Sequence, residues 1–149
     1  MARFDILFFD LDGTLLGPDH IAVSPRNREA LSAAACAGVR LAFATGRCLA
    51  MIPRENVGTP FDYAVTSNGV AIHDLRADQM LYRRAFTPEE ARLACRATAQ
   101  CVDFFELFVD GRIRLTDSDF VRVDTRPLPI WHVDYFARHH DPSLGRLED

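Results

Sequence analysis

The chain has 149 residues, of which 48% are hydrophobic and 26% charged, a balance typical of a globular protein with a packed core. The net charge of -4 argues against nucleic acid as a partner, and no apolar stretch is long enough to cross a membrane. The amino terminus meets an acidic residue before any long apolar stretch, so we expect a cytoplasmic protein. The four cysteines show no metal-binding or disulfide spacing and predict buried, reduced thiols.

The first half of the sequence alternates predicted strands and helices. The continuous apolar run Ile6–Phe9 predicts a strand buried on both faces. A helix is expected from Ser24 until Gly38, followed by a second strand, Val39–Ala44. A short helical piece then precedes a third strand, Tyr63–Thr66. This order favours an α/β fold with a Rossmann-like, doubly wound parallel sheet.

The second half has the pattern of an antiparallel α+β unit. A capping box at Thr87 predicts a helix, and a further short helix is expected near Asp134–His139. The expected strands, of which the last two form a hairpin, are Val70–His73, Leu81–Phe86, Phe104–Val109 and Arg112–Leu115. We therefore predict two domains, residues 1–70 and residues 71–149.

Two carboxylates, Asp10 and Asp12, stand two residues apart where the first predicted strand enters a glycine turn. Such a pair can divide its work, with one carboxylate as nucleophile and the other as general acid and base. Thr45, Gly46 and Asn68 follow the second and third strands, and open α/β sheets bind ligands at that edge. The backbone N–H groups of the glycine turn and the Thr45 hydroxyl suit a phosphate group. An ordinary turn without function is the alternative interpretation of the first motif.

Several short motifs occur in a fixed order along residues 4–70. They are Asp10-Leu11-Asp12-Gly13-Thr14-Leu15-Leu16, Ser24-Pro25-Arg26, Gly38-Val39, Thr45-Gly46-Arg47 and Ser67-Asn68-Gly69. In these motifs the sequence resembles the haloacid dehalogenase-like (HAD) hydrolases, and more narrowly the Cof-type, subclass IIB sugar phosphatases. The resemblance implies the N-terminal part of a HAD core in residues 1–70 and part of an α+β cap in residues 71–149.

The resemblance also implies a role for each site residue. Asp10 would be the nucleophile that forms an aspartyl phosphate, and Asp12 would protonate the leaving group and later activate water. The Asp10 carboxylate and the Asp12 carbonyl would bind Mg²⁺, and Asn68 would face the substrate. Arg47 has either a structural role or a role at the site. The phosphate would be bound by Thr45 and by the backbone at Leu11, Asp12 and Gly46.

The family also uses a lysine and a later Gly-Asp-x-x-x-Asp segment, and neither occurs in this sequence. A phosphate dianion beside two carboxylates is repelled unless cations compensate. Three functions therefore stay open: a Mg²⁺-dependent phosphomonoesterase for small phosphorylated metabolites such as sugar phosphates, a non-catalytic fragment that binds phosphate or a partner subunit, and a sugar phosphomutase. We expect the chain to be the amino-terminal portion of a longer phosphatase. This portion would either self-associate or be complemented by a separate second half.

Overall fold

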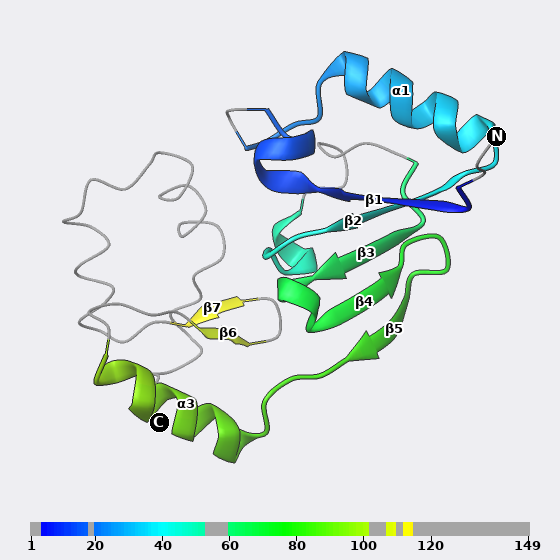
Figure 1. Ribbon diagram of the computed structural model, residues 1–149. Helices are drawn as coiled ribbons and strands as arrows, with labels where there is room; N and C mark the ends of the chain where they lie inside the picture. The colour runs from blue at the N-terminus through cyan, green and yellow to red at the C-terminus, as the bar shows by residue number, and fades with distance from the viewer. Residues whose placement is uncertain (1–3, 18–19, 53–59, 102–106, 110–111, 115–149) are drawn as a thin grey trace. The chain divides into compact units, whose positions relative to one another are not determined.

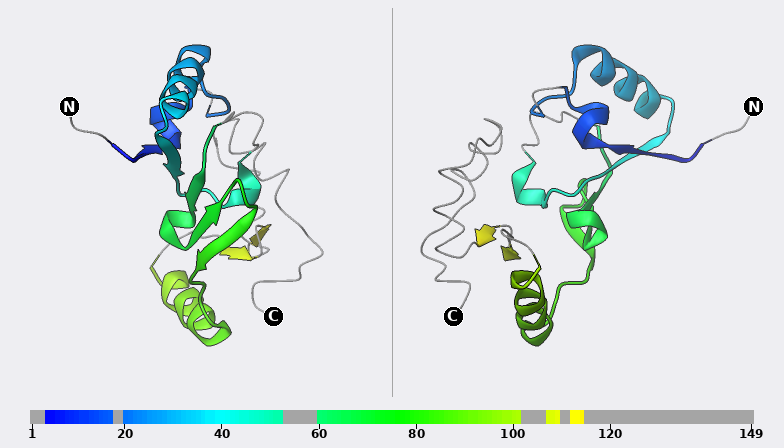
Figure 2. Two further views of the ribbon diagram at one scale, coloured as in Figure 1. Left: turned by 90° about the vertical axis from the view of Figure 1, so that its right-hand side faces the viewer. Right: turned by 60° about the vertical axis from the view of Figure 1, so that its left-hand side comes forward.

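The computed structural model describes residues 4–17, 20–52, 60–101, 107–109 and 112–114 (Figures 1 and 2). The chain divides into two compact units, Met1–Arg84 and Ala85–Asp149.

The first unit is built on a five-stranded mixed sheet with the order β1-β2-β3-β4-β5 (Figure 1). The strands β1, β2 and β3 run parallel to one another, whereas β4 and β5 are antiparallel to their neighbours. Their bounds are β1 (Ile6–Asp10), β2 (Arg40–Ala44), β3 (Tyr63–Thr66), β4 (Ala71–Asp74) and β5 (Gln79–Arg83). The parallel part confirms the predicted Rossmann-like α/β class.

A left-handed turn connects β3 to β4 and reverses the chain. Ser67, Asn68 and Gly69 have φ angles of 52°, 55° and 92°, which let β4 fold straight back onto β3. The strands that we expected at the start of a second domain therefore extend the first sheet. The two compact units divide after Arg84 and not after residue 70. The change in sequence pattern at Gly69 coincides with the change from parallel to antiparallel strand pairing.

The helix α1 (Pro25–Cys36) connects β1 to β2 and starts as predicted. The Ser24 hydroxyl accepts a hydrogen bond from the backbone N–H of Asn27 at 3.2 Å, and proline occupies the first helical turn. Gly38 has a φ of 83° and lets the chain turn towards β2. Figures 1 and 2 show α1 beside β1 and β2, at the end of the sheet away from β5.

The core of the first unit lies around β2. Leu41 and Phe43 of β2 are buried together with Leu31 of α1, and the rings of Phe43 and Phe61 meet edge to face at 5.2 Å. The prediction that the run Ile6–Phe9 is buried on both faces is wrong, because Phe8 is 58% exposed. Within the described residues β1 is an edge strand, so one side of it has no neighbouring strand.

The second unit begins with α3 (Pro88–Ala99), which has the predicted capping box. The Thr87 hydroxyl accepts the Glu90 N–H, and the Glu90 carboxylate accepts the Thr87 N–H. β6 (Leu107–Val109) and β7 (Arg112–Arg114) pair antiparallel and confirm the hairpin. The helix expected near residues 134–139 lies outside the described residues. Whether this unit is part of a cap stays a prediction.

Two further findings concern the whole described part of the chain. Cys48 is buried, but Cys36 and Cys101 are exposed, so the expectation of buried thiols is wrong for these two. None of the helices in the described ranges is long and apolar enough to span a membrane.

Candidate active site

The predicted site residues meet at the carboxyl ends of β1, β2 and β3. In the parallel register Asp10 pairs with Ala44, so Thr45 follows directly beside the carboxyl end of β1. The Thr45 N–H donates to Val65 O at 3.0 Å, and the Asn68 N–H donates to Thr45 O at 3.1 Å. These backbone bonds hold the loops after β2 and β3 together, as expected for a ligand-binding edge of an α/β sheet.

Asp10 is the last residue of β1 and its side chain is exposed. The tight loop Leu11–Leu15 follows, with Leu11 and Leu15 buried as its anchors and Gly13 at a φ of 77°. The Thr14 hydroxyl donates a hydrogen bond to Asp10 Oδ2 at 3.2 Å. A strand end thus holds Asp10 in place while its carboxylate stays accessible.

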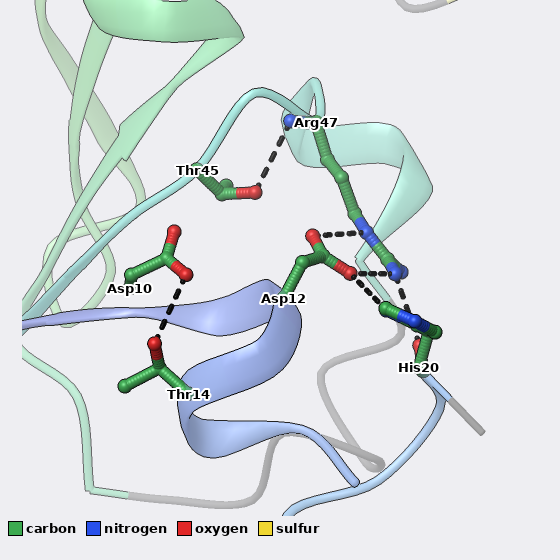
Figure 3. A network of polar contacts seen from close by, with 6 residues as sticks. All are labelled: Asp10, Asp12, Thr14, His20, Thr45 and Arg47. Carbon is green, nitrogen blue, oxygen red and sulfur yellow. Dashed lines mark hydrogen bonds and ion pairs between the residues drawn. The ribbon is translucent and has the colours of Figure 1, made fainter. Parts of the chain in front are cut away.

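Asp12 is the second residue of this loop, and two side chains bind to it (Figure 3). Arg47 Nε donates to Asp12 Oδ2 at 3.0 Å, and Arg47 Nη2 donates to Asp12 Oδ1. His20 Nδ1 lies 3.0 Å from Asp12 Oδ1, and the backbone carbonyl of His20 accepts a second bond from Arg47 Nη2 at 3.0 Å. The structure therefore gives Arg47 a place in the site, a question that the sequence left open.

The surroundings of Asp12 set its ionisation. Partial burial by itself would raise the pKa of the Asp12 carboxyl. The hydrogen bonds from Arg47 and His20 and the charge of these groups act in the opposite direction and outweigh it, so the pKa of Asp12 lies below its usual range. Asp12 is a carboxylate at neutral pH.

The remaining predicted residues surround the same strand ends. Thr45 is buried, and its Oγ1 accepts the Arg47 N–H at 3.2 Å, so its own hydroxyl proton can still be donated. Gly46 lies against Asn68, because a Cβ atom at Gly46 would be 3.2 Å from Asn68 Oδ1. The Asn68 side chain is exposed. Figure 3 shows Thr45 on the side of Asp12 where Asp10 also lies.

The donor atoms at the site fit a small hard cation. Mg²⁺ prefers oxygen ligands and is commonly held by one or two carboxylates, with waters and substrate phosphate completing its shell. The exposed Asp10 carboxylate and the Asp12 carbonyl are oxygen donors of this kind. Among the described residues no group of three or more His, Cys, Asp or Glu side chains gathers around a common point.

His20 is the site residue that the sequence did not indicate. It follows Asp12 by eight residues, in a loop with no periodic pattern, and a lone histidine there carries no motif. Its proximity to the Asp12 motif was the available signal, but the contact depends on how the loop returns from β1 to α1.

The fold and the site define an α/β protein with two carboxylates paired at the carboxyl end of β1. Residues 7–109 match the family model of the haloacid dehalogenase-like hydrolases. The chain belongs to this family, in agreement with the motifs at Asp10, Thr45 and Asn68.

Three individual proteins are similar to this chain over most of its length. The HMP-PP phosphatase of Klebsiella pneumoniae (strain 342) is 33% identical over 106 residues, which make up 69% of this chain and 38% of that protein. A solved subclass IIB sugar phosphatase has a TM-score of 0.60 and 28% identity, covering 75% of this chain and 44% of that one. A haloacid dehalogenase-like hydrolase from B. subtilis shares the fold with a TM-score of 0.69 at 23% identity, covering 90% and 50% of the two chains. This chain thus spans half or less of the length of these relatives.

Proposed function

We propose that this chain carries the nucleophile and the general acid and base of a Mg²⁺-dependent phosphomonoester hydrolase. Its substrates would be small phosphorylated metabolites, of which sugar phosphates are the favoured class. Asp10 attacks the phosphorus and forms an aspartyl phosphate, and Asp12 exchanges protons with the leaving group and with water.

The observation that carries this proposal is the unequal surroundings of the two carboxylates. Asp10 ends a strand, is exposed and accepts one hydrogen bond from Thr14. Asp12 is half-buried, and Arg47 and His20 hold both of its oxygens. A nucleophile needs an accessible oxygen, and a proton carrier needs a fixed orientation toward the leaving group. The two environments support these separate roles.

Charge compensation supports the dependence on a divalent cation. The sequence has no lysine, and the Arg47 guanidinium is bonded to Asp12. Among the described residues Asp10 has no ion-pair partner, so a phosphate dianion that approaches it is repelled unless a cation compensates. Mg²⁺ held by the Asp10 carboxylate and the Asp12 carbonyl would supply the positive charge that draws the phosphate and the nucleophile together.

The steps of the reaction assign one task to each residue. Asp12 is ionised in the free chain, so it takes up a proton from the solvent as the negatively charged phosphoester binds beside it. An Asp10 oxygen then bonds to phosphorus while the bond to the leaving-group oxygen breaks, and that oxygen takes this proton from Asp12. Asp12, now ionised, accepts a proton from water, whose oxygen attacks the aspartyl phosphate and releases phosphate and free Asp10. The Thr45 hydroxyl and the backbone at Leu11, Asp12 and Gly46 would hold the phosphoryl oxygens.

The substrate class rests on the relatives, of which one is an HMP-PP phosphatase and another a sugar phosphatase. Asn68, exposed beside Gly46, would face the substrate. We also propose that residues 85–149 are part of an α+β cap whose polar groups select the substrate.

The test is phosphate release from a panel of sugar phosphates in the presence of Mg²⁺, with the unmodified chain beside its Asp10→Asn variant. We expect release that EDTA abolishes and that the variant lacks, and a phosphorylated intermediate detected by mass spectrometry in the Asp12→Asn variant. A phosphomutase would yield an isomer of the sugar phosphate in place of phosphate. Phosphate binding without turnover, equal in both proteins, would favour a non-catalytic fragment and contradict the proposal.

A further inference from the structure

His20 contacts the site at two points, although it belongs to none of the family motifs. Its ring nitrogen Nδ1 lies 3.0 Å from Asp12 Oδ1, and its backbone carbonyl accepts Arg47 Nη2 at 3.0 Å. A carboxylate oxygen only accepts hydrogen bonds, so Nδ1 carries the proton in this contact. His20 is therefore bonded to both members of the Asp12 and Arg47 pair.

The backbone of the loop is shaped to present His20 in this way. His20 has a φ of 55°, in the left-handed region that a residue with a side chain rarely adopts. The loop is closed at its base by the pairing of Leu16 with Val23, both of which are buried, and the His20 N–H donates to Gly17 O at 2.9 Å. An uncommon backbone conformation at the residue that contacts Asp12 supports a role for the His20 side chain at the site.

The bonds to Asp12 are divided unequally between its two oxygens. A carboxylate offers about four acceptor sites, two on each oxygen. His20 Nδ1 and Arg47 Nη2 fill both sites on Oδ1, whereas Arg47 Nε fills one site on Oδ2. Among the contacts of the described residues the open site is on Oδ2, and Figure 3 shows Oδ2 on the side toward Thr45 and Asp10, with Oδ1 toward His20.

We propose that His20 is a positioning residue for Asp12, which together with Arg47 saturates Oδ1 and so presents Oδ2 to the leaving group of the phosphoester. This inference rests on the proposed function of Asp12 as the group that exchanges protons with that leaving group. Asp12, a carboxylate in the free chain, takes up a proton from the solvent on Oδ2 when the phosphoester binds; in the transfer this Oδ2–H bond breaks, and the proton joins the leaving-group oxygen as its bond to phosphorus breaks. Without His20 one site on Oδ1 opens, and the carboxylate can turn or take its proton on the oxygen that faces away.

Two variants separate the side chain of His20 from the shape of its loop. Glycine and asparagine both accept a φ near 55°, so neither His20→Gly nor His20→Asn strains the backbone. Asparagine places an amide N–H close to the position of Nδ1 and can still bond to Asp12, whereas glycine removes the donor.

The measurement compares two substrates in the presence of Mg²⁺. A sugar or alkyl phosphate has a leaving group that needs a proton, and p-nitrophenyl phosphate has one that leaves readily without it. We expect His20→Gly to lower kcat for the sugar phosphate about tenfold, a part of the roughly 10²–10⁴-fold that general acid catalysis contributes, and to leave p-nitrophenyl phosphate nearly unchanged. His20→Asn should keep most of the activity on both substrates. Equal losses on both substrates, or equal behaviour of the two variants, would overturn the proposal.

A second readout does not depend on turnover. In an unfolding cycle with Asp12→Ala, His20→Gly and the double variant, we expect the two sites to be coupled by about fivefold in the unfolding equilibrium constant. Independent effects of the two substitutions would overturn the positioning role. Failure of the proposed function looks different: the unmodified chain would then release no more phosphate than Asp10→Asn, and the coupling between His20 and Asp12 would still be measured.

Discussion

Removal of the Arg47 side chain tests the electrostatic design of the site most directly. In the structure Arg47 donates through Nε and Nη2 to the two oxygens of Asp12 and through Nη2 to the carbonyl of His20. The variant Arg47→Ala would leave a half-buried carboxylate with one hydrogen-bond donor, His20, among the described side chains. We expect it to lower both the stability and the activity of the chain.

The size of the stability loss follows from the contacts and their exposure. A hydrogen bond to a charged group contributes about 1.5–3 kcal/mol when it is well buried, so two such bonds set an upper range of about 3–6 kcal/mol. The side chains of Arg47 and Asp12 are 21% and 35% exposed, and ion pairs in water are screened to about 0.2–1 kcal/mol. We therefore expect the free energy of unfolding to fall by about 1–2 kcal/mol at neutral pH. Arg84→Ala, at an exposed position, is the control and should change it by less than about 0.5 kcal/mol.

The pH dependence of the free energy of unfolding tests the pair of Arg47 and Asp12 a second time. Because the pKa of Asp12 is lowered in the folded chain, the stabilisation is complete above the pKa of an unfolded aspartate, about 3.9, and is lost as the pH falls through the folded pKa. Urea unfolding of both proteins should thus show a difference at pH 7 that shrinks in acid below about pH 4. Carbon-13 NMR should show a higher pKa for Asp12 in Arg47→Ala. An equal difference at pH 7 and in strong acid, or an unchanged pKa, would refute the argument.

Further substitutions test two other contacts of the first unit, one at Asp62 and one between Gly46 and Asn68. Asp62 is buried, and its Oδ2 accepts the Leu41 N–H at 2.8 Å. Asp62→Ala leaves this buried donor unpaired and should lower the free energy of unfolding in urea by about 1–3 kcal/mol. Asp62→Asn keeps an acceptor and should lower it by less, and equal losses in the two variants would contradict this reasoning. Gly46→Ala would place a Cβ atom 3.2 Å from Asn68 Oδ1 and should raise KM for the substrate by about tenfold, the worth of roughly one hydrogen bond. Asn68→Ala should raise KM alike, and a further rise in the double variant would show that the two residues act separately.

The elements that the sequence predicted well are those whose signals are local. Apolar runs that end at glycine marked β2 and β3, and the Thr87 capping box marked α3, because each signal lies within a few residues of the element that it defines. The position of Asp10 at the carboxyl end of β1 was predicted from one short motif in the same way.

The features that the sequence missed depend on distant parts of the chain. The apolar run of β1 has the composition of a central strand, yet Phe8 is 58% exposed, and composition does not reveal how many neighbours a strand has. The bond between Arg47 and Asp12 spans 35 positions, and the approach of His20 requires a left-handed backbone that histidine seldom adopts. Such contacts are determined by tertiary packing and have no local pattern.

The edge position of β1 also determines how the surroundings of Asp10 can be extended. Within the described residues the backbone of β1 pairs with β2 on one side, and its other side has no partner strand. A strand that joined this side in parallel would end level with Asp10 and place its own following loop beside that carboxylate. The open side of β1 is therefore the place where one added segment of polypeptide would bring new side chains close to Asp10.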